Sequence, residues 1–175
     1  MGIFGAKWRF MGICGKSEML LTGSFSRAVD EKLRVALPKR FRLAMGCPDR
    51  GLLYLTPGWD KCVEIYTQEA LTRLAQRLAA GSPSHPQVRD FARLFYGQTH
   101  QVELDAQGRV RIPKELADWA QLQTDVILIG VQDHVELWSK QRWEVFLAEK
   151  QPHFDQIAQR AFDPPTAGNC LPPSG

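Results

Sequence analysis

Residues 100–116 read HQVELDAQGRVRIPKEL, and a close copy of that stretch, FSRAVDEKLRVALPKRF, stands at residues 25–41. The two copies align without a gap from end to end, at one constant offset. The alignment equates an aspartate, an arginine, a proline and a lysine in each: Asp30 with Asp105, Arg34 with Arg109, Pro38 with Pro113, and Lys39 with Lys114. An internal repeat of this kind predicts that one structural unit is written twice in the chain.

The likeness between the two copies continues downstream. LLYL at 52–55 aligns with ILIG at 127–130 at the same offset. VEIY at 63–66 then aligns with VELW at 135–138 at a shorter offset, which indicates a three-residue insertion in the first copy around residues 56–58. Each unit therefore spans about fifty residues.

Each unit is expected to begin with a strand that ends at the aspartate, then a three-residue turn and a strand that opens at the arginine. In the second copy, apolar and polar side chains alternate between two faces: Val102, Leu104, Val110 and Ile112 on one, Glu103, Asp105, Arg109 and Arg111 on the other. A proline-led short helix, two strands and a closing helix (68–80 or 141–149) follow. Because one such unit cannot bury its apolar face alone, we predict an α+β fold in which two tandem units interlock into one pseudo-two-fold β-barrel with flanking helices.

These patterns divide the chain into five segments. They are an N-terminal extension (1–19), the first repeat (20–80), a linker and helix (81–97), the second repeat (98–150) and a tail rich in proline and glycine (151–175). The composition of residues 81–86 is that of a linker, and we expect the end of the tail to be disordered.

The charge of the chain is unevenly distributed. The net charge is only +3, but residues 1–60 carry ten Lys and Arg against five Asp and Glu, whereas residues 121–175 carry four against seven. A basic front of this kind suits a polyanion on one face. The four cysteines and four histidines have no zinc spacing, and no apolar run approaches the ~18 residues that span a bilayer. We therefore expect no metal, no cofactor, no membrane partner and a cytoplasmic location.

The second turn, Ala106-Gln107-Gly108, has the length of a three-residue hairpin loop, in which Gly108 takes the left-handed position. Asp105 can then accept the N–H groups of the turn and hold Arg109 on the outward face. Taken alone, such a hairpin is a surface turn with a minor ion pair. Two copies with basic neighbours instead favour duplex DNA, where phosphates supply affinity and arginine reaches base edges.

A catalytic reading uses Asp30 and Asp105 as a paired acid and base, because two symmetric carboxylates can separate their pKa values. In duplicated aspartic proteases, however, a hydroxyl residue and a glycine follow the aspartate. Here Glu31-Lys32 and Ala106-Gln107 follow, and each aspartate has its own arginine to keep it ionised. The sequence therefore favours a protein that is not an enzyme and has no small-molecule substrate.

Two D-x-x-x-R turns in tandem, followed by ALPKRFR and RIPKELA, resemble the MraZ family of bacterial transcription regulators, as do RLFYG before the second copy and VELWSKQRWEVFL near the end. The likeness covers about residues 20–150. It implies the AbrB/SpoVT-like swapped-hairpin fold, with one chain supplying both halves of the barrel. It also implies ring-shaped homo-oligomers that bind short direct repeats upstream of the division and cell-wall gene cluster.

The chain departs from the family pattern in two places. Leu33 stands where the family has glycine in the first turn, so a left-handed conformation there would cost on the order of 1 kcal/mol. Leu33→Gly is then expected to stabilise the fold. The family pattern also begins close to TGSF at residues 22–25, so that Met11 or Met19 is the expected start.

The resulting hypothesis is a nucleoid-associated regulator that binds double-stranded DNA as a homo-oligomeric ring. We expect six cationic side chains to contact DNA and three further residues to shape the turns. The DNA contacts are Arg34, Arg109, Arg27, Lys32, Lys39 and Arg111; the turn-shaping residues are Asp30, Asp105 and Gly108. The alternative is a ring-forming scaffold, or an antitoxin-like partner binder, that uses the same turns on protein.

Overall fold

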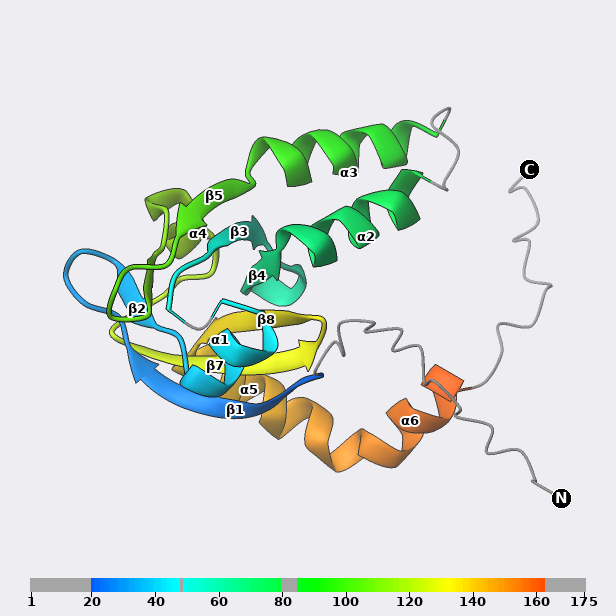
Figure 1. The fold of residues 1–175 in the computed structure, drawn as a ribbon. Helices are drawn as coiled ribbons and strands as arrows, with labels where there is room; N and C mark the ends of the chain where they lie inside the picture. Colours follow the sequence, from blue (N-terminus) through cyan, green and yellow to red (C-terminus); the bar gives the residue numbers. More distant parts are fainter. Residues whose placement is uncertain (1–19, 48, 80–84, 163–175) are drawn as a thin grey trace, which may run out of the picture.

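The computed structural model describes residues 20–47, 49–79 and 85–162 (Figure 1). The first repeat contains β1 (Leu21–Ala28), β2 (Arg34–Ala36), α1 (Lys39–Ala44), β3 (Leu52–Pro57), η1 (Trp59–Lys61), β4 (Val63–Thr67) and α2 (Gln68–Ala79). After α3 (Pro86–Gly97), the second repeat contains β5 (His100–Glu103), β6 (Arg109–Arg111), α4 (Lys114–Trp119), β7 (Asp125–Gln132), β8 (His134–Ser139) and α5 (Lys140–Lys150). The last elements are η2 (Gln151–His153) and α6 (Phe154–Phe162).

The strands of one repeat pair with the strands of the other. β1 lies antiparallel to β7, and β5 lies antiparallel to β3, so that each repeat places its first strand beside the third strand of its partner. β2 and β6 form a separate antiparallel ribbon with one strand from each repeat. These pairings join the two repeats, while β3 pairs with β4 and β7 pairs with β8 within each repeat.

A pseudo-two-fold axis relates the two repeats. Val35 lies directly opposite Val110 in the ribbon, and Glu64 lies directly opposite Glu136 in the β4–β8 pair. Each of these pairs joins equivalent residues of the two copies. The axis therefore passes through the middle of the ribbon and through the middle of the β4–β8 pair.

The register corrects the sequence alignment of the third strands. Leu53 faces Thr67 in the first repeat, and Val126 faces Ser139 in the second, so Leu53 is equivalent to Val126, whereas the sequence alignment had set it on Leu128. Two of the three extra residues of the first copy therefore lie before β3, and only one lies between β3 and β4. The continuous apolar run of β7 permits either alignment, and only the hydrogen-bonded register distinguishes them.

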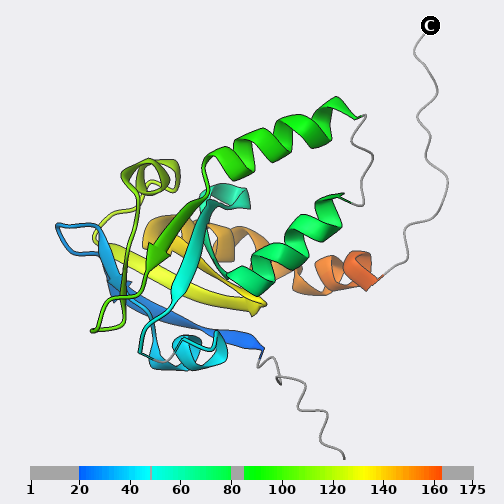
Figure 2. The same ribbon diagram turned by 45° about the horizontal axis from the view of Figure 1, so that its top comes forward.

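The predicted closed barrel is not found among the described residues. Six strands form one open sheet in the order β1-β7-β8-β4-β3-β5, with β1 and β5 at its edges, and the β2–β6 ribbon forms a second, two-stranded sheet (Figure 2). The hydrophobic core includes Val35 and Val110 of the ribbon, Phe41 of α1, Leu116 of α4 and Leu128 of β7. The ribbon and the short helices thus share one core with the inner face of the sheet, and this fixes where the two turns lie.

The helices follow the sequence predictions except at the end of the chain. α2 and α5 occupy the positions of the two predicted closing helices, and α3 begins at Pro86, the last residue of the predicted linker. α6 lies inside the predicted tail and was not foreseen, and the predicted disorder of the tail's end concerns residues outside those described. Within the described ranges, no helix is both long and apolar enough to cross a membrane.

Candidate nucleic-acid interface

Both turns are built by the same set of hydrogen bonds. Asp30 accepts through Oδ1 from the backbone N–H groups of Lys32, at 3.0 Å, and of Arg34, at 2.9 Å. Asp105 accepts through Oδ1 from the N–H groups of Gln107 and Arg109, both at 2.9 Å. An aspartate that opens a turn satisfies donors that a tight loop would otherwise leave exposed, and the sequence predicted this role for both residues.

Each aspartate also holds the arginine that closes its turn. Arg34 Nε donates to Asp30 Oδ2 at 2.8 Å, and Arg109 Nε donates to Asp105 Oδ2 at 2.9 Å. The side chains of Arg34 and Arg109 are 31% and 27% exposed, so that both guanidinium groups are partly covered and oriented in place. The two turns therefore present arginine in a fixed geometry rather than on a free side chain.

The hydrogen bonds keep both carboxyl groups ionised. The side-chain bond from Arg34 is the main cause that lowers the pKa of Asp30 to about 2, and its backbone bond adds to the effect. The backbone bond from Arg109 is the main cause that lowers the pKa of Asp105. Because each carboxylate has its own arginine, the pair does not have the shared proton of an acid–base dyad.

Leu33 and Gly108 occupy the same position of the two turns, and both are left-handed, with φ of +57° and +73°. The first turn therefore keeps the conformation for which Gly108 is suited. The neighbours differ: a Cβ atom on Gly108 would lie 2.8 Å from the guanidinium carbon of Arg42 in α1, and the pseudo-two-fold equivalent of Arg42 is Ala117. In the second turn, Gly108 is small and its neighbour in α1, Arg42, is large. In the first turn, Leu33 is large and packs against the core, and the residue of α4 equivalent to Arg42 is the small Ala117.

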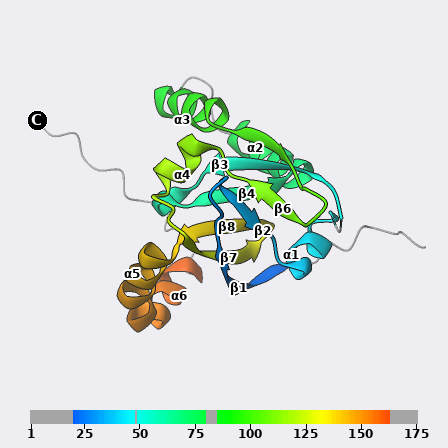
Figure 3. The same cartoon turned by 90° about the vertical axis from the view of Figure 1, so that its left-hand side faces the viewer.

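The two turns meet at the ribbon, which Figure 3 shows in the middle of one side of the molecule. Arg34 lies directly opposite Arg111, and Arg109 lies opposite Ala36, while Val35 and Val110 face the core. Arg109 Nη1 also lies 4.0 Å from Oδ2 of Asp30 in the other repeat. Three arginines of the ribbon therefore share one outward face.

The other cationic residues predicted to contact DNA lie on this face, beside it or away from it. Arg111 is exposed on the ribbon, Lys32 is exposed in the first turn, and Lys39 is exposed at the first residue of α1, immediately after the ribbon strand and its proline. Arg27 is set apart: it lies on β1, its guanidinium 5.8 Å from the ring of Phe25 and bonded to the carbonyl of Ser26. The structure thus brings five of the six predicted cations to the ribbon and its flanks.

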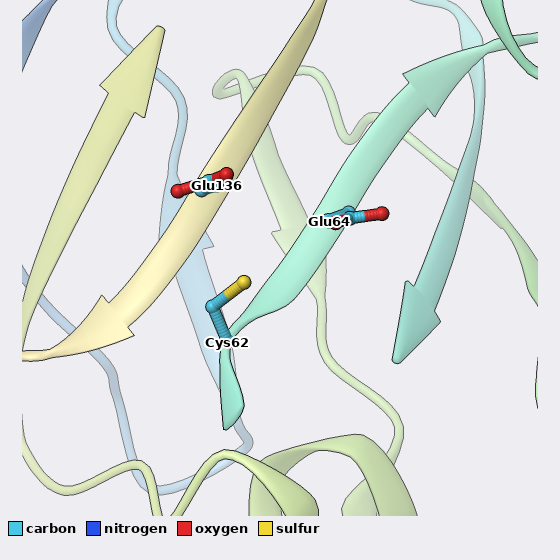
Figure 4. Close-up of side chains that lie close together, drawn as sticks. All are labelled: Cys62, Glu64 and Glu136. Atoms are coloured by element: carbon cyan, nitrogen blue, oxygen red, sulfur yellow. The ribbon is translucent and has the colours of Figure 1, made fainter. Parts of the chain in front are cut away.

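A second polar cluster lies on the β4–β8 pair and was not foreseen as a site. Glu64 accepts from the Tyr66 hydroxyl at 2.8 Å, and Glu136 accepts from Nε1 of Trp138 at 2.8 Å. These are equivalent bonds in the two repeats. Figure 4 shows Glu64 on β4, Glu136 on β8 and Cys62 just before β4, and oxygen and sulfur atoms of the three lie within 4.8 Å of one another. The signal was present in the sequence, because VEIY and VELW align a glutamate with a glutamate.

The pKa values of the two glutamates in this cluster are shifted in opposite directions. Burial raises the pKa of Glu64, with the bond from Tyr66 acting against it. Burial also acts to raise the pKa of Glu136, but bonds from His134 and Trp138 outweigh burial and lower it. Two ionised carboxylates this close would repel one another by roughly 3 kcal/mol at an effective dielectric constant of about 20. The pair therefore has opposite pKa shifts, with ionisation disfavoured at Glu64 and favoured at Glu136.

The fold and the site together define a class: a duplicated α+β protein that presents two matched Asp–Arg turns on a ribbon shared by its repeats. Residues 95–164 match a protein family described as "MraZ protein, putative antitoxin-like". The chain is 38% identical to the transcriptional regulator MraZ of Thermomicrobium roseum, over 81% of this chain and 96% of that protein. It is 35% identical to that of Ligilactobacillus salivarius (82% and 98%) and 32% identical to that of Desulforamulus reducens (82% and 99%). The chain belongs to the MraZ family.

Proposed function

We propose that the protein is a DNA-binding transcriptional regulator whose contact surface is the β2–β6 ribbon and its two turns. The observation that carries the proposal is the arginine face of the ribbon, where Arg34 and Arg111 are register partners. Arg34 and Arg109 are held by their own aspartates, and Arg111, Lys32 and Lys39 are exposed around them, so this face carries a net positive charge that suits an anionic partner. Its relatives are named transcriptional regulators, which is consistent with DNA as that partner.

The geometry suggests a division of roles among the cations. Arg34 and Arg109 are oriented by their aspartates, which suits side chains that must reach defined acceptors on base edges or in a groove. Lys32, Lys39 and Arg111 are exposed around them, which suits contacts to phosphates. Arg27, on the edge strand, would contact the flanking backbone of the duplex.

The same proposal includes the finer features that the family resemblance implies. The pairing of strands between repeats supports a swapped-hairpin unit of the AbrB type. We further propose a homo-oligomeric ring that binds direct repeats upstream of the division and cell-wall gene cluster and is associated with the nucleoid. Apolar side chains on α6 support self-association, since Phe154 is 69% exposed and Phe162 is 88% exposed.

A gel shift on DNA from upstream of the protein's own gene cluster tests the proposal. Arg34→Ala combined with Arg109→Ala should abolish the shift while the oligomer, measured by light scattering, stays intact. The matched control is Arg89→Ala with Arg93→Ala, which removes the same charge from exposed sites on α3. Tight, sequence-selective binding by the first double variant would overturn the site assignment.

Salt dependence separates phosphate contacts from base contacts. Each phosphate contact contributes about 0.9 to the slope of log affinity against log salt. Lys32→Ala and Lys39→Ala should each reduce that slope by about 1 and weaken specific and unrelated DNA alike. An unchanged slope in both variants would remove these lysines from the interface.

The second candidate function is that of an interaction protein, either a ring scaffold or an antitoxin-like binder. The family description, which includes the words "antitoxin-like", supports it. In that case the Arg34 and Arg109 variants would lose a protein partner rather than DNA. Absence of a gel shift, together with an arginine-dependent protein complex, would replace the first proposal with this one.

A further inference from the structure

A pocket of about 490 Å³ lies on the side of the β4–β8 pair that carries the glutamates, and the α2 and α3 helices contribute to its lining. Glu64 and Tyr66 of β4 and His134 and Glu136 of β8 line it from the strands. Its volume is within the range of small-molecule sites, which are mostly apolar with a few convergent polar groups. This pocket is distinct from the ribbon, because they share none of their residues.

The helices supply the apolar part of the lining. Leu74 and Leu78 of α2 and Phe91 and Phe95 of α3 line the pocket, and Phe91 and Phe95 stack with ring centroids 5.4 Å apart. Trp59 also lines it and is 72% exposed. These side chains offer hydrocarbon and aromatic faces, and an aromatic face also attracts a cation.

The polar part of the lining is acidic. Glu64 and Glu136 are register partners with oxygen atoms within 4.8 Å, and Asp133 adds a third carboxyl group. The opposing cations are Arg77, whose Nη2 lies 3.8 Å from Asp133, and His134, whose ring nitrogens lie 3.0 Å from Asp133 and 3.6 Å from Glu136. Both side chains contact Asp133 or Glu136, whereas Glu64 receives its hydrogen bond from the uncharged Tyr66 hydroxyl.

We propose that this pocket binds a small organic cation, with an ammonium or amidinium group between Glu64 and Glu136 and an apolar body against Phe91, Phe95 and Leu78. A cation at that place favours ionisation of both directly opposed carboxyl groups and forms charge-assisted hydrogen bonds with both. Each repeat provides one of the two carboxylates, so the ligand bridges the two halves of the fold on their pseudo-two-fold axis.

An organic cation fits this lining better than a divalent metal. Cys62 lies within 4.8 Å of both glutamates, but a metal binds cysteine as thiolate, and Cys62 is buried and directs its Sγ to the carbonyl of Trp59 at 3.1 Å. A bare ion would also leave the apolar side chains of Leu74 and Leu78 uncovered.

The test uses the full-length protein with phenethylamine and its neutral isostere 2-phenylethanol, measured by calorimetric titration and by backbone NMR shifts. Phenethylamine should bind at least about tenfold more tightly than the alcohol, because only the amine forms charge-assisted bonds. The shifts should map to β4, β8, α2 and α3. Equal affinity for amine and alcohol, or shifts confined to other elements, would overturn the proposal without any variant.

Variants then locate the cation. Glu64→Gln combined with Glu136→Gln keeps acceptors for Tyr66 and Trp138 and should reduce the preference for the amine to within about twofold. Glu144→Gln, an exposed glutamate of α5, is the matched control and should leave the preference unchanged. Retention of the preference in the folded double variant contradicts the assignment. Binding of Zn²⁺ at Glu64 and Glu136 that phenethylamine does not displace would also contradict the assignment.

Discussion

Leu33 and Gly108 adopt the same left-handed backbone conformation at equivalent positions of the two repeats, although one is a large apolar residue and the other has no side chain. The carbonyl of Leu33 accepts from the N–H of Ile112, and that of Gly108 accepts from the N–H of Leu37, each across the repeats. The turn residue is therefore fixed by the partner repeat as well as by its own loop.

For Leu33→Gly, the packing of Leu33 in the structure predicts the opposite of the effect expected from sequence. Relief of the left-handed conformation favours glycine by about 1–2 kcal/mol. Leu33, however, is partly buried against the core. Loss of that burial costs a comparable amount, and glycine also gains freedom in the unfolded chain. We predict a net loss of about 1 kcal/mol in the free energy of unfolding, measured by urea titration. A gain in stability would mean that backbone strain outweighs packing at this turn.

For Gly108→Ala, we predict a modest loss of about 1 kcal/mol, from the positive φ. The added Cβ atom would meet the end of the Arg42 side chain, which can move away at small cost. Gly108→Ala measured with and without Arg42→Ala gives the coupling between the two sites. If the coupling free energy exceeds the free energy lost in Gly108→Ala alone, the Arg42 side chain does not move away from the added Cβ atom.

The stability of the folded protein at acid pH should depend on the ionisation of Asp30. The pKa of Asp30 in the folded protein, about 2, lies below its unfolded value near 4, so its contribution to stability is complete above that value and is lost as pH falls toward 2. Carbon NMR of the Asp30 carboxyl group should give a midpoint near 2. In Arg34→Ala the midpoint should rise, since the main cause of the shift is removed. An unchanged midpoint in that variant would place the cause elsewhere.

Glu64 and Glu136 should respond oppositely to neutralisation. Burial raises the pKa of Glu64, so the folded state favours its proton and loses stability as pH rises above about 4. We expect Glu64→Gln to raise Tm by a few degrees (about 3 °C) at pH 8, with the gain shrinking toward pH 4.

Glu136→Gln is the matched comparison at pH 6. The pKa of Glu136 is lowered and that of His134 is raised by their contact, so this variant should lower Tm where both groups are charged. The same sign of change in both variants would contradict the opposite pKa shifts of Glu64 and Glu136.

The sequence by itself determined the duplicated unit, the alternation that places Val110 in the core and Arg109 outside, and the roles of Asp30 and Asp105 in their turns. These follow from local spacing, since strand alternation and turn chemistry act over a few residues. The tertiary structure decided what depends on distant partners. It set the register of β3 and β7, it allowed Leu33 a left-handed conformation by packing it against the core, and it brought Glu64 opposite Glu136. Each depends on which strand of the other repeat lies alongside, and one-dimensional spacing does not specify that neighbour.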